Sequence, residues 1–316
     1  MRAANCSPTM LISLKQPPRR LDCFLASRCR FPGTLFRAIL SVVTLTLFMA
    51  LPGRAADLQE DTAKAYEQYV AAAEARMERE RSAPGKFLHI ENLPEAAQKR
   101  IWASLRRGEI WTSTLDALDG AGHEIHAPHG TITHWVGDVF FPGSTIDQIL
   151  GIIRDYDHLQ EIYKPEIVRS KLLARDGETF QVYMRLHKDT PWVNPTFDVN
   201  STVTCTRFDS THVACRMVST RVVQVEDAGK PTEHEDSVGH DGGYLWRLST
   251  YWRLEARDGG VVGEWEAITL SRDIPFLLRW LVRPYVERLA RQTVQATLMV
   301  TRNEVERRRK PSHLSQ

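Results

Sequence analysis

The sequence predicts an α+β domain in which a curved antiparallel sheet wraps around a long C-terminal helix, with a helical extension at the N-terminus. Segments with strand-like alternation follow one another from residue 110 to 271, and most are joined by short turns. The chain then closes with a long helical pattern. With 316 residues, 42% of them hydrophobic and 25% charged, the composition is that of an ordinary globular protein.

Residues 1–55 are typical of a secretion signal. A basic stretch precedes the apolar run 38–51, and the small residues before Ala56 predict cleavage after Ala55. This run is shorter than the roughly 20 residues that span a bilayer, so an uncleaved membrane anchor is the alternative interpretation. We therefore expect an exported protein, periplasmic or extracellular.

The charge of the remaining chain argues against a nucleic-acid partner. Without the leader, the 41 basic and 39 acidic residues become 33 and 38, which is a net charge of −5. Nucleic-acid binding depends largely on positive charge that neutralises phosphates. The domain has no such excess.

Residues 56–108 are predicted to form the helical extension. Residues 57–80 are rich in Ala, Glu, Lys, Arg and Gln, which predicts a solvated helix. A second helix over 96–105 begins after Pro94 and stops at Gly108. We expect an appendage without a core of its own.

The main domain is predicted over 109–310, followed by a disordered tail at 311–316. Two strands, 110–115 and 131–141, lead to a helix over 145–155 with Ser144 as N-cap, and a short helix covers 157–163. Six further strands follow at 166–173, 178–187, 196–207, 212–223, 243–255 and 261–271. The last helix covers 276–308, and Pro284 is expected to kink it or to begin a new helix.

Two stretches of this order resemble the START/SRPBCC family. The FFPG turn at 140–143 and the phrase RDYDHL at 154–159 are similar to its first strand and helix pair. YWRL at 251–254, the turn DGG and LSRDIP at 270–275 are similar to its last hairpin before the final helix. The resemblance implies a helix-grip fold with a cavity for a hydrophobic small molecule or lipid between sheet and helix, but it names no chemistry.

Period-two alternation predicts which strand residues face this cavity. A two-residue turn at Asp258-Gly259 would place Trp252 and Trp265 on the same face of the final hairpin. The predicted cavity residues are Phe180, Val182, Met184, Phe197, Val199, Met217, Arg221, Trp246, Trp252, Trp265, Thr293 and Thr297. The inward tryptophans can equally be core filler, and Arg221, the one charged member, can instead reach solvent at a strand end.

The other sheet face is expected to be wet. Arg247, Arg253, Glu264 and Glu266 lie there as candidates for cross-strand ion pairs.

Cys205 and Cys215 are predicted to lie opposite each other on neighbouring strands. They can pair in an oxidising compartment, but two buried thiols that pack as apolar groups are the favoured interpretation.

The sequence offers no positive sign of catalysis, metal or cofactor. His123, His126 and His129 with Glu124 come nearest to a metal cluster, but they lie in a turn-rich segment without ligand geometry. The loop 226–242 is expected to be a solvated flap, and the apolar residues 276–281 either form a portal lip with transient membrane contact or pack under the sheet edge.

These observations favour a protein that binds a lipid or other hydrophobic molecule, with transport of that molecule as a further hypothesis. Two alternatives stay open. The same cavity would also suit an enzyme of cyclase or hydrolase type, and a filled core would indicate a protein-interaction domain.

Overall fold

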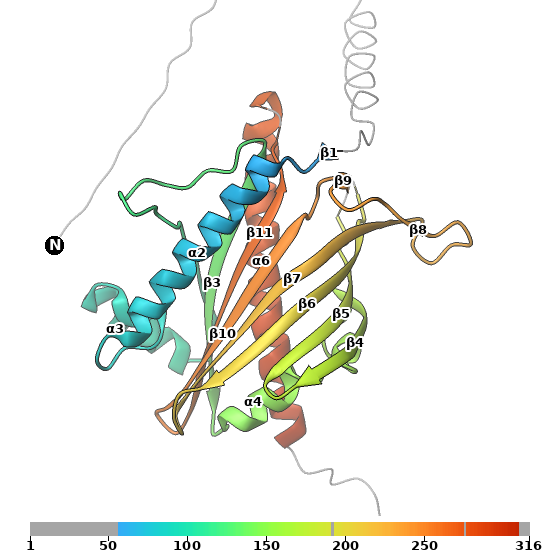
Figure 1. Cartoon of the computed structure of the whole chain (residues 1–316). Coiled ribbons are helices and arrows are strands. Elements are labelled where there is room, and N and C mark those ends of the chain that lie inside the picture. The colour runs from blue at the N-terminus through green and yellow to red at the C-terminus, as the bar shows by residue number, and fades with distance from the viewer. Residues whose placement is uncertain (1–55, 191–192, 275, 310–316) are drawn as a thin grey trace, which may run out of the picture. The chain divides into compact units, whose positions relative to one another are not determined.

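The computed structural model describes residues 56–190, 193–274 and 276–309, without the side chains of 276–279 and 281–283. The predicted leader, the predicted tail and most of the apolar stretch at the start of the last helix lie outside the described residues. Figure 1 shows the described elements as a sheet with helices on both faces.

The predicted antiparallel sheet is confirmed. Its order is β2-β3-β11-β10-β7-β6-β5-β4, and β8 pairs with β7, which makes nine strands. The strands are β2 (Trp111–Thr114), β3 (Gly130–Pro142), β4 (Ile167–Asp176), β5 (Thr179–His187), β6 (Thr196–Arg207), β7 (His212–Glu226), β8 (His234–Glu235), β10 (Arg247–Arg257) and β11 (Gly260–Arg272). A separate two-stranded ladder joins β1 (Ala56–Asp57) to β9 (His240–Asp241).

The hairpin of β10 and β11 has the predicted register. Asp258 and Gly259 both have positive φ, 53° and 73°, as the tight turn requires. Trp252 therefore lies directly opposite Trp265. We call the face that carries these two tryptophans the inner face.

The inner face is covered by the long last helix, α6 (Phe276–Arg309), which confirms the helix-grip arrangement. In Figure 1 this helix runs behind the sheet. It approaches β3 closely at Gly137, where an added Cβ would lie only 2.6 Å from Val294 Cγ1. Pro284 lies inside the helix, which is continuous across it.

Two short helices, α4 (Ile146–Ile153) and α5 (Leu159–Ile162), pack near the C-terminal half of α6. The N-cap of α4 is Thr145 and not the predicted Ser144. The Thr145 hydroxyl accepts from the Gln148 N–H at 3.3 Å, and the Gln148 side chain accepts from the Thr145 N–H at 3.0 Å. This reciprocal capping box fixes the start of the helix.

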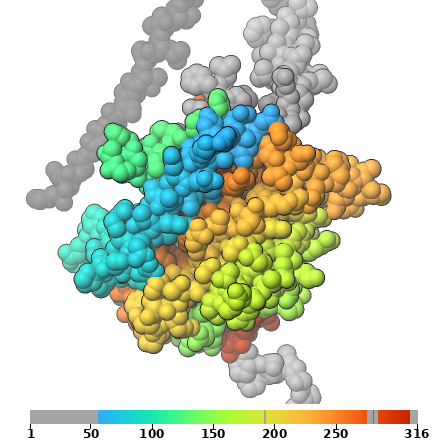
Figure 2. All heavy atoms as spheres, in the orientation of Figure 1, coloured from blue at the N-terminus to red at the C-terminus, as the bar shows by residue number. Residues whose placement is uncertain are grey.

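The N-terminal extension differs most from its prediction. The helix α2 (Glu60–Ser82) is not solvated, because it lies across the outer face of the sheet. It is followed by η1 (His89–Asn92) and α3 (Glu95–Arg106). Figure 2 shows α2, in blue, lying over the strands.

A stripe along α2 explains this packing. Tyr66, Tyr69, Val70, Ala73 and Met77 recur at helical spacing and are buried. They form one apolar cluster with outer-face residues of β10 and β11, Tyr251, Ile268 and Leu270 among them. The extension is therefore a third layer of the domain.

None of the described helices is long and apolar enough to cross a membrane.

Candidate functional site

The space between the inner face and α6 is filled at one end. Near α4, Val139, Phe141 and Leu254 of the sheet and Leu298 and Val305 of α6 are buried in one cluster. This half is a close-packed core that leaves little room for a guest.

The other half, which we call the open half, is less completely buried. Its inward residues are partly exposed although they lie between sheet and helix. They are Trp135, Leu186, Met217, Leu248, Trp265, Ala267 and Thr269 of the sheet, with Ala290, Thr293 and Thr297 of α6. These side chains keep partial contact with solvent, although Leu186, Met217 and Trp265 also pack against the inner core cluster.

Tryptophan rings line the boundary between the two halves. Trp252 and Trp265 lie with ring centroids 6.4 Å apart and planes tilted by 42°. Trp135 follows on the next strand, opposite Ala267. The rings give the open half an apolar wall.

One ion pair stands at the edge of the open half. Lys188 Nζ donates to both carboxylate oxygens of Glu166 at 2.8 Å and to the Thr293 hydroxyl of α6 at 2.9 Å. Because Thr293 belongs to α6, this contact ties the helix to the β4–β5 side of the sheet. We call these three residues the lip.

The structure distributes ten of the twelve predicted cavity residues over two buried clusters and the open half. Phe180, Val182 and Met184 lie in the filled inner core. Phe197 and Val199 form a small cluster with Val222, against which Leu186 packs. Met217, Trp265, Thr293 and Thr297 belong to the open half, and Trp252 borders it.

Arg221 does not face inward. An extra residue, Thr220, interrupts the pairing of β6 and β7, so Ser201 pairs with Ser219 but Asn200 pairs with Arg221. This bulge reverses the alternation beyond it. Arg221 instead forms an ion pair with Glu235 and is about one-third exposed.

Trp246 is also misplaced by the simple alternation. It precedes β10, and its indole N–H donates to Asp241 at 3.1 Å. Its ring packs in the outer cluster beside Tyr251. It therefore belongs to the layer under α2 and not to the cavity.

The outer face carries a buried ionic network that the sequence only half predicted. Arg253 pairs with Glu264 and more distantly with Glu266, as expected, but these three side chains are buried. From α2, Glu80 accepts from Arg253 at 2.7 Å and Arg76 pairs with Glu266. This part of the face, which was expected to be wet, is dry because the extension covers it.

Two further groups tie this network to β3. His134 contacts Glu266 at 2.7 Å and the Tyr69 hydroxyl at 3.0 Å. Burial alone would raise the pKa of Glu266, but the His134 hydrogen bond and the charge of Arg76 hold it below its usual value. The same balance lowers the pKa of Glu80, where His89, Arg253 and Arg76 outweigh burial.

Asp138 is the exception in this network. It is fully buried, and neither of its carboxylate oxygens has a hydrogen-bond partner. Burial, and next the charge of Glu264 directly opposite, raise the pKa of Asp138 well above its ordinary value. This carboxyl group is therefore protonated more readily than its neighbours.

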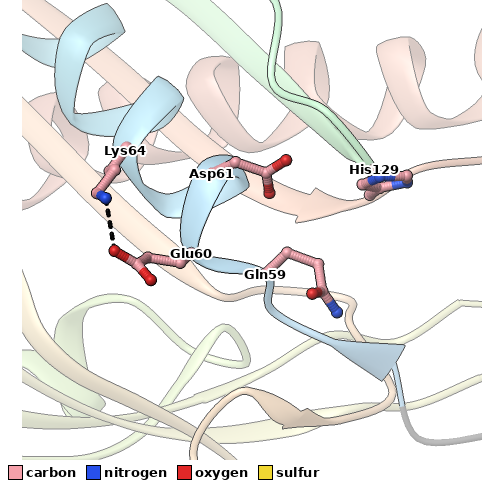
Figure 3. Close-up of a pocket in the computed structure, with 5 residues that line it drawn as sticks. All are labelled: Gln59, Glu60, Asp61, Lys64 and His129. Atoms are coloured by element: carbon pink, nitrogen blue, oxygen red, sulfur yellow. Dashed lines mark ion pairs between the residues drawn. The ribbon is translucent and has the colours of Figure 1, made fainter.

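The histidines of the turn-rich segment do not gather with other potential ligands into a group of three or more in the part of the chain that the structure describes. The described residues contain no group of His, Cys, Asp and Glu that could hold a metal ion. His129 lies instead beside a shallow surface pocket of about 370 Å³ with Gln59, Glu60, Asp61 and Lys64 (Figure 3). Lys64 and Glu60 form an exposed ion pair there, so nothing at this pocket points to a ligand.

The two cysteines are bonded. Cys205 and Cys215 pair directly across β6 and β7, as predicted, and they form a disulfide. The interpretation as two free thiols is therefore wrong.

Comparisons with known proteins give a likeness in fold only. No family model matches the chain, and no curated protein matches it. Similar solved structures include a STAR-related lipid transfer protein from Xanthomonas axonopodis, with 14% identity, coverage of 62% of this chain and 98% of that one, and a TM-score of 0.38.

Two more are human STARD10 and the Zhui aromatase/cyclase from Streptomyces. STARD10 has 12% identity, covers 69% of this chain and 84% of its own, and has a TM-score of 0.41. The aromatase/cyclase has 14% identity, covers 58% and 99%, and has a TM-score of 0.39.

Proposed function

We propose that this protein binds a hydrophobic small molecule or lipid in the open half of the inner face. The supporting observation is the partial exposure of apolar residues that lie between two layers of structure, Met217, Trp265 and Ala267 among them. Burial of apolar ligand surface there would contribute about 25 cal/mol per Å².

The charges around the open half favour an uncharged ligand. Its described inward residues carry apolar, hydroxyl or indole groups, and the Lys188–Glu166 pair at the lip neutralises itself. An ionised group placed against this wall would lose its hydration without gaining a partner. A charged headgroup would therefore have to stay outside the lip.

The same composition favours binding over catalysis. An enzyme of cyclase or hydrolase type needs a titratable group that reaches the substrate. Among the described residues, the inward positions of the open half contain none apart from the lip pair. A protein-interaction domain with a filled core is disfavoured by the open half itself.

Export of the protein remains part of the proposal. The Cys205–Cys215 disulfide supports it, because such bonds persist mainly in oxidising compartments. A transient membrane contact is supported by Trp280 near the start of α6, whose side chain is 77% exposed.

Native mass spectrometry with organic extraction tests the binding proposal. The protein is purified from its exported compartment as the native chain and as Ala267→Trp, which would fill the open half. Ala174→Trp serves as control, since Ala174 is exposed on the edge strand β4.

We expect an apolar molecule to accompany the native chain and the Ala174→Trp control and to be absent from Ala267→Trp. A native chain that is empty, and stays empty after incubation with an extract of its own membranes, would contradict the proposal. A molecule retained equally by Ala267→Trp would place the site elsewhere.

A further inference from the structure

A second surface pocket, of about 660 Å³, lies at the filled end of the domain. It is bounded by α4 and by the ends of β6 and β7, away from the open half. Its lining residues are Asp147, Leu150, Gly151, Arg154, Asp155, Glu178, Cys205, Arg207 and Val213.

One cysteine of the disulfide belongs to this lining. Cys205 belongs to the lining set, whereas Cys215 does not. Both side chains are otherwise nearly buried, with 5% and 6% exposure. Of the two cysteines, Cys205 is therefore the one on the pocket side.

A guanidinium group lies against the Cys205 sulfur. Arg154, which caps the C-terminus of α4, places its Nε 3.3 Å from Cys205 Sγ, and it also pairs with Glu178. A cation in this position attracts an approaching thiolate and stabilises a thiolate that forms there.

The other charges of the pocket are paired, as Arg154 is with Glu178. Arg207 pairs with Asp147, and Asp155 pairs with Arg308 of α6. Of the described cations, Arg154 is the one with a hydrogen bond to the sulfur.

We propose that the Cys205–Cys215 bond is a thiol-exchange site at which a dithiol reductant attacks the Cys205 sulfur from this pocket. The reductant's thiolate bonds to Cys205 as the original S–S bond breaks, and Cys215 takes the electron pair and then a proton. The second thiol of the reductant attacks the first reductant sulfur, so Cys205 leaves as a thiolate beside Arg154.

The balance of this exchange is a two-electron transfer. The dithiol loses two electrons and two protons and becomes a disulfide, and the cysteine pair gains them. Reduction removes the covalent link between β6 and β7 inside the inner core cluster, next to α4. The reverse reaction restores the link through the Cys205 thiolate.

The test compares reduction of the folded full-length chain by dithiothreitol in three forms. These are the native chain, Arg154→Gln and the control Arg175→Gln, which removes a surface arginine that pairs with Glu178 but has no hydrogen bond to the sulfur. Reduction is followed by alkylation and mass spectrometry. We expect native and control chains to be reduced at the same rate and Arg154→Gln several-fold more slowly.

A second measurement separates the two sulfurs. In Cys215→Ser, the remaining Cys205 should be alkylated by iodoacetamide near neutral pH, whereas Cys215 in Cys205→Ser should react far more slowly. Adding Arg154→Gln to Cys215→Ser should raise the pH at which Cys205 is alkylated toward the pKa of an ordinary thiol, about 8.5.

Resistance of the native disulfide to dithiothreitol until the protein unfolds would overturn the proposal. Equal reduction rates in the native chain and Arg154→Gln would do the same. These two outcomes need no cysteine substitution, so they stand even where a serine variant fails to fold.

Discussion

The guanidinium group of Arg253 on β10 donates to the carboxylate of Glu80 on α2 over 2.7 Å, and both side chains are buried. This contact joins the N-terminal extension to the outer face of the sheet. It is surrounded by Glu264, Glu266 and Arg76, so removal of one member leaves the others without water or a full set of partners.

Glu80→Ala should therefore destabilise the fold strongly. Loss of one partner of a buried ion pair costs about 3–5 kcal/mol, because the other charge remains buried. The free energy of unfolding is measured by urea titration. Glu78→Ala, which breaks an exposed pair with Arg81 on the same helix, should change it by no more than about 1 kcal/mol. Similar losses in both variants would mean that α2 does not hold the sheet through this network.

Asp138→Asn should change how stability depends on pH. A carboxyl group with a raised pKa in the folded state stabilises the fold below its unfolded value of about 3.9. That stability is lost as pH rises through the folded pKa. The Asp138→Asn variant has no carboxyl group to deprotonate at this position, so it does not lose this stability. Its free energy of unfolding should therefore increase relative to that of the native chain as pH rises above about 4.

The matched control for this effect is Asp147→Asn, whose side chain is 78% exposed. Its difference from the native chain should show no comparable trend between weakly acidic and neutral pH. A flat difference for Asp138→Asn as well would show that Asp138 is not held in its protonated form.

Fluorescence quenching should report a guest in the open half. A bromoalkane such as bromododecane quenches tryptophans that it touches, so it should quench the native chain, and Trp265→Phe should lose a large share of that quenching. Trp102→Phe should keep it, because Trp102 lies on the outer side with its ring 4.3 Å from the Arg257 guanidinium. Equal quenching in both variants would count against the open half as the site.

Lys188→Met should speed ligand exchange. The lip ties α6 to the β4–β5 side through Lys188, and loss of its three contacts lets the two layers separate more easily. The time course of bromododecane quenching should be several-fold faster than in the native chain. Lys171→Met, on the exposed surface of β4, should exchange at the native rate. No change in Lys188→Met would mean that entry does not pass the lip.

The sequence was sufficient for the main architecture because its local patterns agree with the final fold. Alternation along β5 placed Phe180, Val182 and Met184 inward, and the Asp258-Gly259 turn set Trp252 opposite Trp265. These assignments depend only on residues a few positions apart, for which periodicity is informative.

The errors arose where one residue or one distant partner overrides the pattern. Thr220 adds a position to β7, and Arg221 consequently turns outward. Strand β10 begins one residue after Trp246, so alternation along the strand does not apply to it. Neither feature has a clear signature in a single sequence.

The buried face of α2 did have a signature. Tyr66, Tyr69, Val70, Ala73 and Met77 recur at spacings of three and four, but the many charged neighbours lower the mean hydropathy of the helix. Arg253, Glu264 and Glu266 on the sheet face under α2 are expected to be solvent-exposed because they are charged. Their burial depends on a partner in the extension that no local pattern reveals.

The packing of α2 depends on a strand that the ribosome synthesises much later. The Tyr66 hydroxyl bonds to the carbonyl of Ile268, which lies 202 positions later. At the usual pace of translation the helix exists for on the order of ten seconds or more before its docking strand is made. During that interval the tyrosines of α2 are exposed to solvent. A chain that stalls before β11 would therefore be a target for chaperones and proteases.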